Sequence, residues 1–206
     1  QFYYPFSINP RIDTLLGNEF NQNDKMLIPV IKGGDGKYIK PLYNAHYGYA
    51  DYETYGFGFN KFKIMNSSDL ESITIILNER LNNAVYKDHS IYSTYNGKLC
   101  LSAIWPSFYI KYEDVMGIPQ KKELKDIKTD NAKDTTKKIF EYYNLGEILL
   151  SMENDLDSYS AFFKNKIVIM GNFEEDTHFT AVGKMSGSVL LANIYLTLLN
   201  KEHVMS

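Results

Sequence analysis

The residues with the clearest chemical potential lie in one stretch near the C-terminus, FFKNKIVIMGNFEEDTHFTAVGKMSGSVLLANIYLTLLN, from Phe162 to Asn200. Asp176 and His178 stand two positions apart in its middle. A carboxylate and an imidazole can contact a ligand, and His46 from a second strand would complete a His/His/Asp set of the kind that binds a metal ion. The alternative is structural, with Asp176 accepting backbone N–H groups and His178 filling a polar gap.

Other reactive groups have simpler explanations. Glu174 and Glu175 could form an acid/base pair, but three consecutive acids on a loop favour plain solvent exposure. Ser186 in MSGS lacks the glycine placement of a nucleophile elbow, and GGDG at Gly33–Gly36 is typical of a turn rather than a phosphate loop. Cys100 is the single cysteine, so an internal disulfide and a cysteine-based zinc site are excluded. We therefore expect no enzyme activity and no cofactor.

The elements that must position Asp176 and His178 follow from hydrophobic patterning. Lys166–Gly171, KIVIMG, is a run of consecutive apolar residues, which predicts a strand buried on both faces of a sheet. Residues 172–186 are then a loop at the carboxyl end of that strand, where open α/β sheets bind ligands. The sequence thus predicts that a central strand carries the pair to the rim of the sheet.

A helix is predicted from Gly187 to Asn200, apolar nearly all round. Gly187 at its start leaves backbone N–H groups that could meet an anion. Its narrow polar stripe consists of Asn193, Thr197 and Asn200. Such a helix is expected to be almost fully covered, by the protein or by a partner.

The rest of the chain alternates strands and helices. Residues 67–86, SSDLESITIILNERLNNAVY, predict a helix with capping-box spacing between Ser68 and Glu71. Aromatic strands are expected on either side of DYETYG, and another strand after the Asn-Gly turn of YNGKLC. We therefore predict an α/β fold with a mainly parallel or mixed central sheet covered by helices on both faces, a three-layer sandwich.

Bulk composition fits one folded domain. The chain has 206 residues, of which 44% are hydrophobic and 23% charged, and its net charge of −3 gives no basic field for nucleic acid. The longest apolar run, near Val189–Leu199, is too short to cross a bilayer. The opening QFYYPF without an initiator methionine suggests a piece of a longer protein, and Pro119–Lys138 is expected to be a charged, solvated insertion.

The C-terminal stretch resembles CHASE2 domains, the extracytoplasmic sensory modules of bacterial transmembrane receptors. That family shows a lysine-rich entry to an apolar KIVLIG strand, an acidic residue with H-x-T, a glycine, and a helix containing A-N and a leucine pair. The chain supplies the corresponding residues in order: Lys166 to Gly171, Asp176, His178, Thr180, Gly183, Gly187, Ala192, Asn193, Leu198 and Leu199. HYGYADYE, SSDLESITIIL and YNLGEIL also resemble segments of the family.

The resemblance covers the chain from about Met26 onward. It implies a single CHASE2-like sensory domain over residues 1–206, in which the family's first strand and helix are missing and residues 119–138 are inserted. It also implies a location outside the bacterial inner membrane, on its periplasmic face. One transmembrane segment would come before the domain, and others after Ser206 would lead to a cytoplasmic output domain.

We therefore expect a non-catalytic domain that senses an unknown small-molecule signal and that could form a homodimer. The candidate ligand contacts are Asp176, His178, Thr180, His46 and Tyr49. Two alternatives remain open. One is a metal-dependent hydrolase using Asp176, His178 and His46. The other is a ligand-free dimerisation scaffold built on the apolar C-terminal helix.

Overall fold

The computed structural model describes residues 10–23, 25–30, 32–39, 46–50, 52–55, 58–63, 70–89, 92–100, 107–111, 143–153, 156–202 and 204–205. It divides into two compact units, residues 1–112 with 171–206, and residues 113–170. Each unit is described by itself. The predicted insertion at 119–138 and the opening QFYYPF lie outside the described residues.

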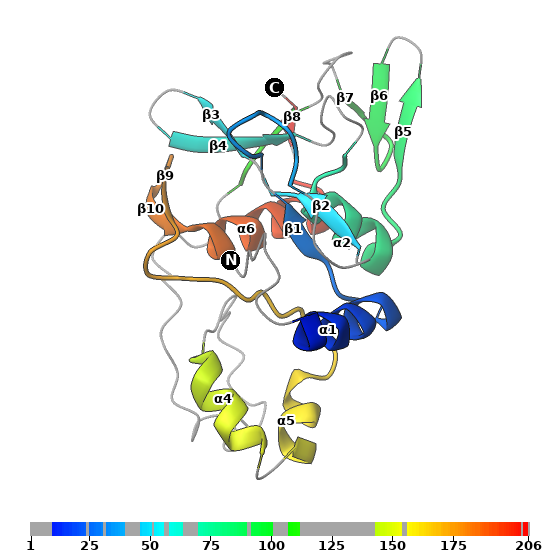
Figure 1. The fold of residues 1–206 in the computed structure, drawn as a ribbon. Coiled ribbons are helices and arrows are strands. Elements are labelled where there is room, and N and C mark those ends of the chain that lie inside the picture. Colours follow the sequence, from blue (N-terminus) through cyan, green and yellow to red (C-terminus); the bar gives the residue numbers. More distant parts are fainter. Residues whose placement is uncertain are drawn as a thin grey trace, which may run out of the picture. The chain divides into compact units, whose positions relative to one another are not determined.

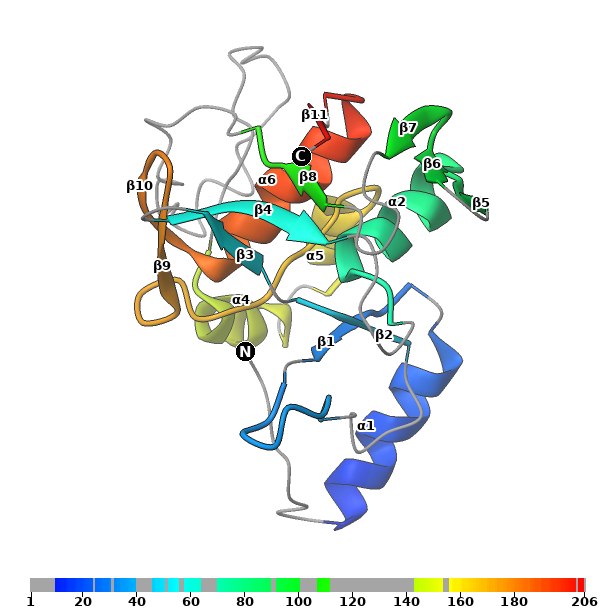
Figure 2. The ribbon, with the colours of Figure 1, turned by 90° about the horizontal axis from the view of Figure 1, so that it is seen from above.

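The first unit combines helices with small sheets (Figures 1 and 2). Its described helices are α1 (Pro10–Gln22), α2 (Ile73–Asn82) and α6 (Gly187–Leu199). Its described strands are β1 (Ile28–Val30), β2 (Tyr47–Tyr49), β3 (Tyr52–Tyr55), β4 (Gly58–Lys63), β5 (Tyr86–His89), β6 (Tyr92–Tyr95), β7 (Lys98–Cys100), β8 (Ser107–Tyr109), β9 (Thr177–Thr180), β10 (Gly183–Ser186) and β11 (Val204–Met205). The predicted mixture of α and β structure is confirmed.

Among the described strands, six form the largest sheet. The strands β10, β9, β4, β8 and β11 follow one another in it, and β3 also pairs with β4. The strands β5, β6 and β7 form a second sheet, and β1 pairs with β2 in a third. Among the described strand pairs, β1–β2 and β4–β9 are parallel and the others are antiparallel. The pairing is therefore mixed, with antiparallel neighbours predominating.

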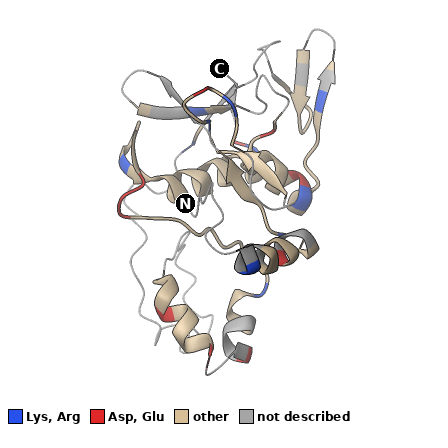
Figure 3. Cartoon of the chain, in the orientation of Figure 1, with Lys and Arg blue, Asp and Glu red and all other residues tan. Residues whose placement is uncertain are grey.

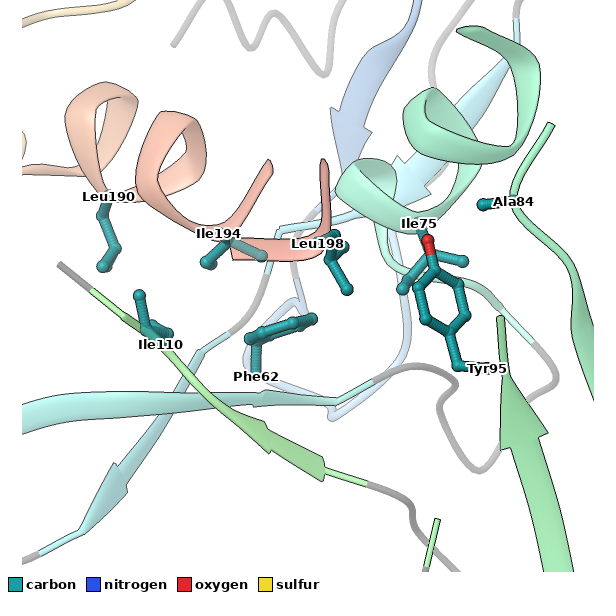
Figure 4. Close-up of a cluster of buried hydrophobic side chains, with 8 residues drawn as sticks. All are labelled: Phe62, Ile75, Ala84, Tyr95, Ile110, Leu190, Ile194 and Leu198. Carbon is teal, nitrogen blue, oxygen red and sulfur yellow. The ribbon is translucent and has the colours of Figure 1, made fainter. Parts of the chain in front are cut away.

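The core of this unit lies where α6 and α2 meet the strands (Figure 4). Phe62 of β4 contributes the largest apolar side chain from the six-stranded sheet, and Tyr95 of β6 joins from the three-stranded sheet. The buried cluster consists of Phe62, Ile75, Ala84, Tyr95, Ile110, Leu190, Ile194 and Leu198. Because three of these residues come from α6, that helix is the centre of the core.

The polar stripe of α6 faces inward. Asn193 and Thr197 are both 0% exposed. Asn193 Nδ2 donates to the backbone oxygen of Val189 at 3.0 Å, and Thr197 Oγ1 accepts from the backbone N–H of Lys111 at 3.0 Å. Only Asn200, the C-cap residue, is exposed. The stripe therefore anchors the helix internally, and the prediction of an almost fully covered helix is confirmed.

Helix α2 begins one turn later than the capping pattern predicts. Its N-cap is Ser72, without a side-chain cap bond, and Ser68 lies outside the described residues. Strand β2 passes close to the start of α2, since a Cβ on Gly48 would lie 2.8 Å from the Cα of Ile73. Glycine is thus required at position 48 because the strand backbone and the helix backbone are nearly in contact.

Several short-range predictions are confirmed. Asn96 and Gly97 have φ values of 48° and 77° and join β6 to β7 in a tight turn. Gly33–Gly36 is a turn, closed by a 3.0 Å bond from the Gly36 N–H to the Gly33 oxygen. Strands on either side of DYETYG were expected, but Tyr52–Tyr55 of that segment is itself strand β3, which pairs antiparallel with β4. Asp13 lies within the 13-residue helix α1, which begins at Pro10.

The predicted central strand at Lys166–Gly171 is wrong. Residues 166–170 form no strand. Ile167, Val168 and Met170 are 44%, 55% and 54% exposed. An apolar run favours an extended chain but does not supply the neighbouring strands that would pair with it and cover it. The segment leading to the candidate site is therefore exposed, and the core centres on α6 instead.

The second unit contains α4 (Leu145–Met152) and α5 (Leu156–Phe163) among its described residues. Asn144 caps α4 by accepting from the Glu147 N–H at 3.2 Å. The Phe162 ring meets Tyr143 edge-on at 5.5 Å and carries Lys166 Nζ 3.5 Å from its centroid. In neither unit is any helix of the described ranges long and apolar enough to cross a membrane.

Candidate functional site

Asp176 and His178 form a direct contact. His178 Nε2 lies 3.0 Å from Asp176 Oδ1, and both side chains are partly exposed. Residues two apart on a strand share one face, so the D-x-H spacing at the start of β9 brings the two groups together. The contact is a hydrogen bond that becomes an ion pair when the imidazole is protonated.

A hairpin, rather than a loop, holds the pair. Strands β9 and β10 pair antiparallel, with His178 opposite Met185. Thr180 Oγ1 donates to the Gly183 oxygen at 2.7 Å and accepts from the Val182 N–H at 3.2 Å. The prediction of an irregular segment over 172–186 is wrong here. The hydroxyl of Thr180 makes these hydrogen bonds within its own turn, and its contact with a ligand stays a prediction.

The first residue of α6, Gly187, packs against the Asp176–His178 pair. The Gly187 N–H donates to the backbone oxygen of Asp176 at 2.8 Å, and Ser186 Oγ caps the helix by accepting from the Val189 N–H at 3.3 Å. A Cβ on Gly187 would lie 2.5 Å from Asp176 Oδ2 and 3.1 Å from His178 Nε2. The chain's own carboxylate thus lies at the positive end of the helix dipole, where the sequence suggested that an external anion could bind.

The segment before the pair is organised by Asn172. Its Oδ1 accepts from the N–H groups of Glu174 and Glu175 at 3.2 and 3.0 Å, and its Nδ2 donates to Glu175 Oε2 at 2.9 Å. The backbone N–H of Asp176 donates to the backbone oxygen of Asn172 at 3.3 Å. Glu174 and Glu175 are exposed, as predicted. This turn fixes where the chain enters β9.

His46 and Tyr49 occupy different surroundings. His46 is exposed, and its backbone oxygen accepts from the Ile28 N–H at 3.0 Å beside β2. Tyr49 is buried, with its ring tilted against that of Tyr38 at 6.1 Å. Within the described ranges, no group of three or more His, Cys, Asp or Glu side chains could hold a metal ion. The predicted set of His46, Asp176 and His178 is therefore not assembled there.

Sequence reasoning missed a polar cluster between α2 and α6. Asn82 Nδ2 donates to Asn78 Oδ1 at 2.8 Å and to the hydroxyl of Tyr195 at 3.0 Å. The hydroxyl of Tyr95, on β6, is near the same two helices. Its pKa is raised by burial, and it is raised further by the charge of Glu79 on α2 and by the hydroxyl of Tyr195 on α6. The only sequence signal was the spacing of Asn78 and Asn82, one helical turn apart. The cluster connects the two core helices through polar contacts.

Comparison with known proteins yields no match to a protein-family model, to a curated protein or to a solved structure. Functional inference therefore depends on the site itself. The Asp176–His178 pair can donate and accept hydrogen bonds at a partly exposed position beside a helix start. Such a pair suits reversible binding of a polar group.

Proposed function

We propose that the chain is a non-catalytic, extracytoplasmic ligand-sensing domain of a bacterial membrane-anchored receptor. The observation that carries the proposal is the contact between the Asp176–His178 pair and Gly187, the first residue of the central helix. A ligand that exchanges hydrogen bonds with this pair must disturb the start of α6. The ordered resemblance of Lys166–Leu199 to CHASE2 domains supports the same function.

The far end of α6 provides the output of the proposed sensor. The hydroxyl of Thr197 accepts a hydrogen bond from the backbone N–H of Lys111 and donates one to the backbone oxygen of Lys111, the second residue after β8. Beyond the helix, the carboxylate of Glu202 pairs with Lys111 Nζ, and β11 pairs antiparallel with β8. A small shift of α6 would therefore also move β11. Ligand binding would act by favouring one of two positions of this helix.

The proposal includes the receptor context that the resemblance implies. The complete domain would be a three-layer sandwich on the periplasmic side of the inner membrane. Transmembrane segments would flank it, a cytoplasmic output domain would follow them, and the receptor could function as a homodimer. Reading the gene on both sides of these residues tests this part, since hydrophobic spans and a kinase or cyclase domain are expected there.

A melting-temperature screen against small metabolites tests ligand sensing directly. A ligand at a hundred times its dissociation constant stabilises the folded state by about 2.7 kcal/mol. For a chain of this size, that corresponds to a rise in melting temperature of about 5–10 °C. Asp176→Asn and His178→Gln should abolish the rise, and Glu174→Gln, on the exposed turn, should retain it. A flat response over a broad library would contradict the proposal.

A dimerisation scaffold is the second candidate, because the neighbouring apolar side chains of Ile167, Val168 and Met170 are exposed. Helix α6, which suggested this function from sequence, is buried and cannot provide the surface. Exposed apolar segments with unpaired backbone are prone to pair with another chain. Sedimentation velocity should then show a concentration-dependent dimer that Val168→Lys dissociates. The exposed Leu149→Lys variant serves as the control.

A further inference from the structure

The three-stranded sheet β5–β6–β7 has an inner face on the core and an outer face toward solvent. On the inner face, Tyr95 is buried in the core cluster, and its register partner Lys98 donates from Nζ to the backbone oxygen of Lys201. Side chains alternate along a strand, so residues at the other register positions lie on the opposite face. The outer face comprises Lys87, His89, Tyr92, Thr94 and Leu99.

This outer face is apolar and aromatic at its surface. Tyr92 and Leu99 are 39% and 42% exposed, and Val85, one residue before β5, is 47% exposed. The rings of the cross-strand partners His89 and Tyr92 stack with centroids 4.4 Å apart and planes 21° apart. Stacking fixes the tyrosine ring on the sheet surface, where its apolar body and polar hydroxyl are both available.

The same face carries a basic charge and no acid. Lys87 is exposed on β5, between Val85 and His89 in sequence, and its register partner is Thr94. Figure 3 shows a basic stretch on this strand. None of the outer-face positions is Asp or Glu. The net charge of the chain is −3, so this local excess of positive charge differs from the chain as a whole. Charge complementarity therefore calls for an anionic partner.

A second copy of the chain does not meet this requirement. A two-fold contact through the outer face would pair the face with itself. Lys87 would then approach a surface that has its own lysine and no acid. An anionic phospholipid surface meets both requirements, because lipid phosphates attract lysine while tyrosine, leucine and valine enter the headgroup boundary.

The position of the sheet in the chain agrees with a lipid partner. Lys98 of β7 contacts Lys201, in the turn that follows α6 and leads to β11. In the proposed receptor, the chain enters the membrane after Ser206, so Lys201, which this sheet contacts, lies about five residues before the point of entry. This step rests on the proposed function. We propose that the outer face of β5–β6–β7 docks on an anionic phospholipid bilayer.

Vesicle co-sedimentation tests the proposal. The purified chain should bind vesicles of phosphatidylcholine and phosphatidylglycerol in equal amounts, should bind pure phosphatidylcholine weakly, and should be released by salt. Lys87→Gln should lower the partition coefficient about fivefold, the effect of one basic side chain near an anionic surface. Leu99→Ser should lower it as well. The matched controls Lys184→Gln on β10 and Leu149→Ser on α4 should bind like the unmodified chain.

The outcomes separate the possible partners. Absence of vesicle binding, or binding to both vesicle types that Lys87→Gln leaves unchanged, would overturn the proposal. Binding to polyglutamate without vesicle binding would assign the face to an acidic protein. Self-association that Lys87→Gln or Leu99→Ser abolishes would assign it to a second copy. Vesicle binding is measured without ligand and the metabolite screen without vesicles, so failure of one leaves the other interpretable. Lys87 is exposed, so its variant should fold, which an unchanged melting temperature verifies.

Discussion

His178 and Asp176 are joined at 3.0 Å, Nε2 to Oδ1, and the contact lies against the first residue of the most buried helix in the first unit. The carboxylate has two neighbours at once, the imidazole and the backbone of Gly187. Its negative charge is favourable at a helix N-terminus. The site is therefore part of how α6 begins, and changes in the pair should affect the stability of that helix.

Gly187→Ala should destabilise the chain by about 1–3 kcal/mol, the usual cost of inserting a methyl group into a filled space. The new Cβ would lie 2.5 Å from Asp176 Oδ2 and force the carboxylate away from its position. Chemical denaturation measures the loss. A value near zero for Gly187→Ala would show that the pair is free to move and is not held by the helix.

A double-mutant cycle identifies the cause of that loss. In an Asp176→Ala background the clashing oxygen is absent, so Gly187→Ala should lose most of its cost. Alanine could even stabilise the helix, because glycine is the poorer helix former. A coupling free energy of about 0.5–3 kcal/mol is expected for residues in contact. Additive effects would indicate that Gly187 is required for some reason other than space for Asp176.

Gly48→Ala should be among the most damaging single-methyl insertions in the chain. The added Cβ would lie 2.8 Å from the Cα of Ile73, and backbone atoms cannot rotate away as a side chain can. We expect a loss of about 1–3 kcal/mol or more. Gly34→Ala is the matched control, because nothing lies within 4 Å of a Cβ there. Equal melting temperatures for the two variants would contradict the close approach of β2 and α2.

Features encoded within a few residues could be predicted from sequence. The Asn96–Gly97 turn needs two residues that accept positive φ, and α6 needs only an apolar stretch after a capping serine. The Asp176–His178 contact is of the same kind, because two residues of one short segment form it. Such features depend little on what the distant parts of the chain do.

Features that depend on distant partners could not be predicted. The apolar run at 166–170 has the composition of a buried strand, but whether it is buried depends on strands and helices elsewhere in the sequence. His46 and Tyr49 belong to the region of β2, so their position relative to the pair also depends on how distant segments pack. The hydrogen bond between Thr197 and Lys111 also joins residues far apart in the sequence, so it could not be predicted.

Glu71→Gln should raise stability at neutral pH. Burial raises the pKa of the Glu71 carboxyl above 4.5, and the neighbouring charge of Glu79 raises it further. The folded state therefore binds this proton more tightly than the unfolded state. Stability from this group is present at acid pH and is lost as the pH rises through the folded-state pKa.

Urea denaturation from acid to neutral pH measures this effect. The difference in unfolding free energy between Glu71→Gln and the unmodified chain should grow as the pH rises above 4.5 and then level off. The glutamine has no proton to lose, and its amide is neutral at both extremes. Glu174→Gln, at an exposed position, is the matched control for the charge change itself. A difference that shrinks toward neutral pH would mean that the Glu71 carboxylate is stabilised by folding.

Thr197→Val should weaken the link between α6 and β8. Thr197 Oγ1 accepts from the Lys111 N–H at 3.0 Å, and its own proton is shared between the oxygens of Lys111 and Asn193 at 3.0 and 2.8 Å. Valine keeps the shape but leaves the Lys111 N–H without this acceptor, at a cost of about 1–3 kcal/mol. Hydrogen exchange should speed up at the Lys111 amide in this variant.

The Thr197→Ser variant separates the hydrogen bond from packing. Serine keeps the hydroxyl and loses one methyl group, so exchange at the Lys111 amide should stay slow while stability falls by about 1 kcal/mol. If α6 carries the signal of the proposed sensor, Thr197→Val should also leave ligand binding at Asp176 and His178 intact while removing its effect on β11. Faster amide exchange in both variants would show that packing, and not the hydroxyl, holds α6 to β8.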